Sequence, residues 1–234
     1  MSLLLSIETS TTACSVALHE EGKLLQHMET LLPQSASSQL AVLIQQVIAQ
    51  GGKNPEQLDG VIVAAGPGSY TGLRIGVATA KGICYALQIP LVSINTLELL
   101  AYQFISTRPS PLDRGLGGEI LLCPMLDARR MEVYCMLLDS NLIVKEPTQA
   151  KIIDTESFAD KLAVHKVYFF GDGAMKCKEL IKHKNAHFIS GLIPSAVQLG
   201  ELGFVKWKAK QVEDVASFEP YYLKEFMIKK PNFV

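Results

Sequence analysis

The chain has 234 residues, a formal net charge of −1, 48% hydrophobic residues and 19% charged residues. This charge balance supplies no electrostatic footprint for nucleic acid, so the sequence does not indicate an RNA-binding protein acting alone. We find no apolar run near the roughly 20 residues that span a bilayer, and we expect no signal peptide. The five cysteines form no CxxC pair, so neither a zinc site nor a disulfide framework is predicted and a cytoplasmic protein is indicated.

The first hundred residues predict the order β-β-β-α-β-α-β-α. Short β-like runs separated by turns give the expected strands Leu3–Glu8, Cys14–His19, Lys23–Leu31, Gly60–Ala65 and Pro90–Ser93. Helical spacing of apolar residues predicts one helix through Leu40, Leu43, Ile44, Val47 and Ile48 and a second at Leu73–Leu87. A third helix is expected from a cap at Thr96 to Phe104.

A second lobe is predicted after a Pro- and Gly-rich loop at residues 107–118. Its expected strands are Glu119–Leu126, Glu132–Leu138 and Lys166–Phe170, and its helices begin at Thr155 and Ser195. We therefore divide the chain into an N-terminal lobe, residues 1–106, and a smaller C-terminal lobe, residues 107–234. The sequence shows no evident internal repeat.

The segment Gly66–Gly76 reads GPGSYTGLRIG and joins a buried strand to a helix. Backbone N–H groups that converge at such a turn hold an anion or a partner's backbone. The alternative is a tight turn that folding alone requires. Small residues then recur every four positions along the helix, which lets another helix approach closely. We expect a partner interface at Gly72, Leu73, Ile75, Gly76, Thr79 and Ala80.

Four motifs together resemble the TsaB (YeaZ) family of tRNA threonylcarbamoyladenosine biosynthesis proteins, which are relatives of TsaD and of glycoprotease-like proteins. They are IETST at Ile7–Thr11, the glycine loop, LDARRMEVY at Leu126–Tyr134 and PYYLK at Pro220–Lys224. The resemblance covers almost the whole chain. It implies a two-lobed α/β actin-like ATPase/hsp70/sugar-kinase (ASKHA) fold.

The resemblance also implies a function. The chain is expected to be a non-catalytic subunit needed to form threonylcarbamoyladenosine next to the anticodon of tRNAs that read ANN codons. Its expected partners are TsaD, in a heterodimer, and TsaE, while tRNA is met indirectly through the complex. Without TsaD the same face is expected to form a homodimer. The alternative is a metal-dependent glycoprotease-like or kinase-like enzyme of the same superfamily.

The implied fold places nucleotide-binding turns at Thr9 and Ser10 and at Gly171, Asp172 and Gly173. Two such turns hold phosphates through backbone N–H groups when they face each other. No aspartates recognisable as magnesium ligands accompany them. We therefore expect no cofactor of the chain's own, with ATP or ADP at the interface of the complex.

Metal chemistry depends on histidines that TsaD carries, in HxxxH spacing, on the helix after its fifth strand. The matching positions here are Thr96 and Leu100, and neither side chain offers an imidazole. His183 and His187 repeat the spacing in a polar segment of the other lobe, and we interpret this as coincidence. The sequence thus predicts neither a metal site nor a catalytic residue.

Overall fold

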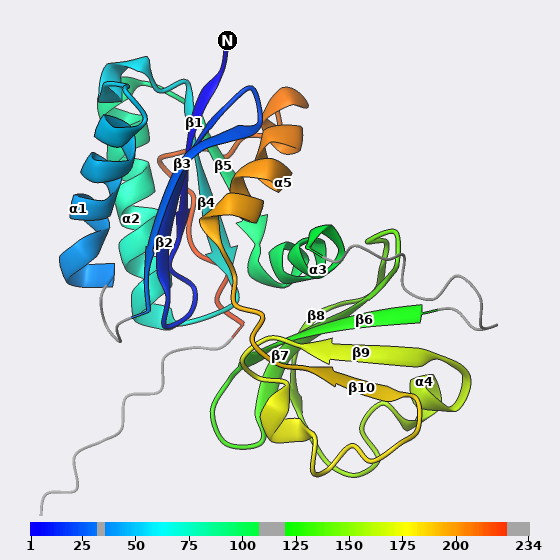
Figure 1. Ribbon diagram of the computed structural model, residues 1–234. Coiled ribbons are helices and arrows are strands. Elements are labelled where there is room, and N and C mark those ends of the chain that lie inside the picture. The colour runs from blue at the N-terminus through cyan, green and yellow to red at the C-terminus, as the bar shows by residue number, and fades with distance from the viewer. Residues whose placement is uncertain (32–35, 108–119, 224–234) are drawn as a thin grey trace, which may run out of the picture.

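The computed structural model describes residues 1–31, 36–107 and 120–223, which form two lobes with a five-stranded sheet each (Figure 1). The first sheet has the order β3-β2-β1-β4-β5. The strands β1, β2 and β3 are antiparallel neighbours, and β4 and β5 run parallel to β1. Their bounds are β1 Leu3–Glu8, β2 Cys14–Glu20, β3 Lys23–Thr30, β4 Gly60–Gly66 and β5 Leu91–Asn95.

Helices cover both faces of the first sheet. The predicted apolar stripe of α1 (Ala36–Gln50) is buried, and α1 packs beside α2 (Tyr70–Leu87) on one face. The other face is covered by α5 (Ala196–Lys208), whose Leu199 joins a buried cluster with Leu4 and Ile62. The helix α3 (Thr96–Ser106) leads toward the second lobe and packs Phe104 against Phe170.

The second sheet repeats the topology of the first. Its order is β10-β9-β6-β7-β8, in which β6, β7 and β8 are antiparallel and β9 and β10 run parallel to β6. The bounds are β6 Ile120–Asp127, β7 Glu132–Asp139, β8 Val144–Ile152, β9 Lys166–Phe170 and β10 Ala186–Ile189. Helix α3 packs against β6 and β7 of this sheet, and the other helical segments of the second lobe in the described residues are short, namely α4 (Ala159–Val164) and the 3₁₀ turn η2 (Met175–Cys177). The molecule is thus a duplicated unit, although its sequence shows no repeat.

The predicted order of elements is confirmed in the first lobe, but the predicted cap of its third helix is corrected. Asn95, not Thr96, caps α3, because its Oδ1 accepts from the N–H of Leu97 at 2.8 Å. The strands β8 and β10 were not predicted. His187 lies in β10 and His183 precedes that strand, so the pair does not share a helical face. The predicted loop at 107–118 lies, beyond Thr107, outside the described residues.

The chain returns to the first lobe at its C-terminal end, which corrects the assignment of all residues after 106 to the second lobe. After α5, residues 213–222 run along the edge of the first sheet, and we call this segment the C-terminal strap. Glu213 N donates to Leu91 O at 2.8 Å, and Tyr221 N donates to Ala65 O at 2.7 Å. The return covers an apolar sheet face and a free strand edge that would otherwise meet water. No helix within the described ranges has the length and apolar character needed to cross a membrane.

Candidate functional site

The glycine turn after β4 is locked to the β1–β2 hairpin. Gly66 has a φ of +107°, a conformation that glycine adopts at little cost. Ser69 caps α2 by accepting from Gly72 N at 3.3 Å, and its own N–H donates to Ser10 O at 2.6 Å. Thr9 Oγ1 donates to Gly72 O at 2.8 Å. The turn therefore uses its glycines for contacts inside the lobe.

This packing corrects most of the predicted interface. A Cβ at Gly72 would lie 2.0 Å from Thr9 O, and one at Gly76 would lie 2.2 Å from Thr9 Oγ1. Leu73 and Ala80 are buried as well. The row of small residues does permit a close approach, but the approaching segment is the chain's own hairpin.

Helix α2 exposes a different row of small residues on its outer side. Together with the outer side of α1 it forms what we call the α1–α2 face, made of Ala41, Val42, Gln45, Gln46, Ala49, Thr71, Arg74, Ala78, Gly82 and Tyr85. Ile75 and Thr79, the remaining predicted interface residues, are half-buried beside this face. A Cβ at Gly82 would have no atom within 4 Å, and the Tyr85 ring is 83% exposed.

The α1–α2 face is almost free of charge. Helix α1 has no charged residue, and α2 has only Arg74 and Lys81. Lys81 Nζ donates to Phe218 O at 2.7 Å and to Ala216 O at 3.1 Å, so its ammonium group binds the C-terminal strap. A broad helical surface with few charges and an exposed tyrosine is typical of a protein-binding site.

The strap reaches this face at the N-terminal end of α2. The Tyr222 ring lies 4.9 Å from the Tyr70 ring, measured between centroids. Arg74 Nη1 donates to Tyr70 Oη at 3.0 Å, and the guanidinium lies 5.4 Å from the centroid of that ring. Arg74 is therefore held by the Tyr70 side chain.

The first predicted nucleotide turn has its side chains directed into the lobe. Thr9 and Ser10 are buried, and Ser10 donates to Glu8 Oε1 through N at 2.6 Å and through Oγ at 2.5 Å. Burial of Glu8 raises its pKa to about 7, although the hydrogen bonds from Ser10 lower it in part. The hydroxyl groups of Thr9 and Ser10 are thus engaged inside the protein.

The second predicted nucleotide turn is built like the first. Gly171, directly after β9, has a φ of +100°, and a Cβ there would lie 2.3 Å from Met125 O. A Cβ at Gly173 would lie 2.7 Å from the carbonyl carbon of Leu126. Asp172 Oδ1 accepts from Asp127 N at 3.0 Å, and burial raises the pKa of Asp172. Each lobe therefore packs a glycine turn on the end of its first strand, and nucleotide binding at the two turns stays a prediction.

The two positions that were expected to match histidines of TsaD are buried. Thr96 and Leu100 are fully buried, and Leu100 lies against the glycine turn at Gly171. Across the part of the chain that the structure describes, no three His, Cys, Asp or Glu side chains are grouped so that they could hold a metal ion.

Two lobes with the same sheet topology, with α3 packed between them, define the actin-like ATPase/sugar-kinase class of folds. The model of the family "TsaD: tRNA N6-adenosine threonylcarbamoyltransferase" matches residues 30–227, and the chain belongs to this family. Within it, the chain resembles the TsaB proteins.

Three relatives carry this resemblance. The protein named tRNA threonylcarbamoyladenosine biosynthesis protein TsaB from Bacillus subtilis is 29% identical over 94% of this chain and 93% of its own length. The protein of the same name from Haemophilus influenzae is 25% identical over the same shares of the two chains. The solved structure of YeaZ from Pseudomonas aeruginosa is 25% identical, with a TM-score of 0.77 over 95% of this chain and all of that one.

Proposed function

We propose that the chain is a non-catalytic subunit needed to form threonylcarbamoyladenosine next to the anticodon of ANN-reading tRNAs, and that it acts by forming a heterodimer with TsaD. The names of its full-length relatives support a part in this pathway. The residues at Thr96 and Leu100 support an accessory role, because neither is an imidazole and both are buried.

The observation that best supports a heterodimer is the α1–α2 face. Its exposed residues are small or uncharged apart from Arg74, so a partner helix can approach without stripping water from many charges. Tyr85 supplies a large aromatic side chain of the type that dominates binding energy. A specific interface of about 800 Å² per partner would use most of the outer side of both helices. A homodimer through the same face is the expected state without TsaD.

Gly82→Arg tests this proposal directly. The new side chain meets open space, so the lobe keeps its fold while a charge and steric bulk enter the middle of the face. We expect the TsaD heterodimer to be lost on a sizing column, while the free chain still shows a cooperative thermal unfolding transition. Val205→Arg is the matched control, because Val205 is 64% exposed on α5, which covers the opposite side of the same sheet. A heterodimer that survives Gly82→Arg would contradict the assignment.

The remaining predicted associations belong to the same proposal. We expect TsaE to join the heterodimer, tRNA to be met through the complex, and ATP or ADP to bind at its interface. The alternative, a metal-dependent glycoprotease-like or kinase-like enzyme, predicts stoichiometric metal or nucleotide turnover by the purified chain. Elemental analysis and an ATPase assay on the chain alone separate the two.

A further inference from the structure

The turn between β6 and β7 holds two arginines in an unfavourable backbone conformation. Arg129 and Arg130 have φ angles of +69° and +50°, in the left-handed region that residues with a Cβ seldom adopt. Glycine or asparagine would adopt this turn more readily. Backbone strain of this kind concentrates where a segment binds something. The strain therefore points to a use for the two arginine side chains.

Lys176 braces the turn from η2. Its Nζ donates to Arg130 O at 2.8 Å, to Glu132 O at 2.6 Å and to Asp127 Oδ1. Three oxygen acceptors thus fix one ammonium beneath the turn. The brace holds the backbone in place, so the arginine side chains project from a rigid base rather than from a free loop.

The charge of the turn is directed outward. Asp127 also accepts from Arg129 N at 2.8 Å, and Asp172 accepts from Asp127 N, so the carboxylates of Asp127 and Asp172 are engaged by Lys176 or by backbone. Arg129 and Arg130 are exposed, and within residues 1–31, 36–107 and 120–223 neither guanidinium has a hydrogen-bond or ion-pair partner. Two residues adjacent in sequence therefore each present a free guanidinium group to solvent.

We propose that this turn contacts the phosphodiester backbone of RNA, with Arg129 and Arg130 donating to phosphate oxygens. The inference rests on the proposed function, in which tRNA reaches the complex. The planar guanidinium fork matches two oxygens of a phosphate. Two such contacts are too few to hold RNA alone, but they can orient an RNA bound mainly by a partner.

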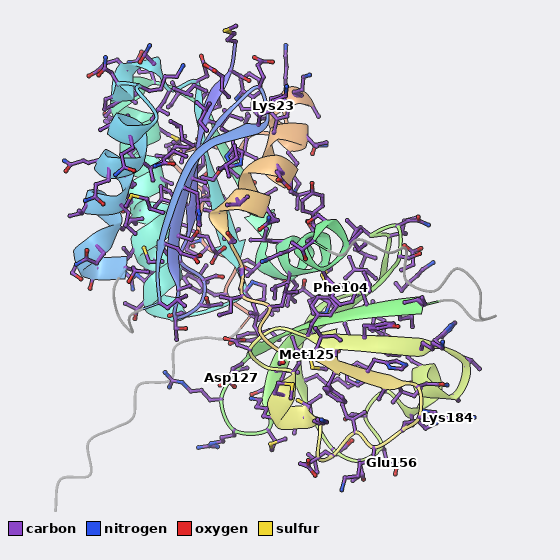
Figure 2. The ribbon with its side chains drawn as sticks, viewed as in Figure 1. Lys23, Phe104, Met125, Asp127, Glu156 and Lys184 are labelled. Atoms are coloured by element: carbon purple, nitrogen blue, oxygen red, sulfur yellow. The ribbon has the colours of Figure 1, made fainter. Side chains whose placement is uncertain are left out.

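The position of the turn favours RNA over the carboxylates of the docked protein. The α1–α2 face belongs to the first lobe, whereas the turn at Asp127 belongs to the second lobe (Figure 2). The turn therefore lies outside the α1–α2 face that is proposed to bind TsaD.

The test uses the purified complex of the full chain with TsaD and measures tRNA affinity against salt concentration. The double variant Arg129→Gln/Arg130→Gln should weaken tRNA binding roughly tenfold at low salt and reduce the slope of log K against log salt by about 1.5. Heterodimer affinity should not change. The matched control is Lys182→Gln/Lys184→Gln, which removes the same charge from exposed positions elsewhere in the second lobe, where Figure 2 labels Lys184 away from Asp127.

A second variant keeps both arginines and removes the brace. Lys176→Met should weaken tRNA binding less than the double variant does, because the guanidinium groups remain but lose their fixed base. Unchanged tRNA affinity and salt slope in the double variant would overturn the inference. So would loss of the heterodimer in that variant, which would assign the turn to the protein partner, or weakened ATP binding with tRNA affinity intact. Failure of the wild-type chain to bind TsaD would instead contradict the proposed function.

Discussion

Glu8 and His19 are buried ionisable residues of the first lobe, and each has a hydrogen-bonding atom without a partner among the described residues. Burial raises the pKa of Glu8 to about 7 and lowers the pKa of His19 to about 4. His19 lies under α5, where a Cβ at Gly200 would be 2.0 Å from its Cε1. Neither environment is visible in the sequence, because burial of a residue near the end of a strand depends on what packs over it.

The two residues have opposite effects on the pH dependence of stability. The folded state favours protonated Glu8, so its contribution is complete below pH 4.5 and is lost as pH rises through 7. The folded state favours neutral His19, so its contribution is present above pH 6.5 and is lost as pH falls through 4. Between these limits the two effects oppose each other in the wild-type chain.

The variant Glu8→Gln should separate the contributions of Glu8 and His19 to the pH dependence of stability. The amide keeps the shape and cannot ionise, so relative to the wild type the variant should gain on the order of 3 kcal/mol of unfolding free energy between pH 4.5 and pH 8, at about 1.4 kcal/mol per pH unit. The free energy of unfolding of the variant should then fall as pH drops from 6.5 to 4, because the folded state favours neutral His19. Urea unfolding at a series of pH values measures both. A difference from the wild type that does not change with pH would show that the pKa of Glu8 is the same in the folded and unfolded states.

At the scale of elements, α2 shows how far a sequence pattern leads. The spacing of small residues correctly predicts that something approaches this helix closely, and the helix itself is confirmed. The pattern does not say which side faces inward, because glycine and alanine occur on both sides. The hydroxyl of Thr9, folded back onto Gly76, decides the question, and that contact joins segments 67 positions apart.

Two glycine substitutions should separate the inner and outer sides of α2. Gly76→Ala would force a methyl group against Thr9 Oγ1 and should destabilise the chain by about 1–3 kcal/mol. Gly82→Ala meets no atom within 4 Å and should stabilise it by about 0.5–1 kcal/mol, because alanine is the better helix former. Chemical denaturation measures both. Equal effects at the two positions would contradict the described orientation of α2.

At the scale of the molecule, the sequence predicted one lobe well and the other in part. Short β-like runs between turns, helical spacing and cap signals identified every strand of the first sheet and the helices α1, α2 and α3. Helix α5 was predicted as well but was assigned to the wrong lobe. The strands β8 and β10 are partly exposed edge strands with weak patterns, and they were missed. The duplication of the lobes lies in strand order rather than in residue identity, so comparison of residues within the chain could not reveal it.

The docking surface stays a prediction. Helix α2 was expected to contribute small residues to it, and the outer sides of α1 and α2 have the composition of a protein-binding surface. The sequence signal for the exposed row of α2 is the second series of small residues at Ala78, Gly82 and Ala86. Residues of the C-terminal strap, such as Tyr222, could not be assigned to the site from sequence because they return from far along the chain.

The central claim is that this chain permits a partner enzyme to modify tRNA and performs no chemistry itself. The most direct measurement is threonylcarbamoyladenosine formation on tRNA by TsaD and the other pathway proteins, with the wild-type chain, with Gly82→Arg, and without the chain. We predict modification with the wild-type chain and its loss in the other two reactions. Equal modification in all three reactions would contradict the account.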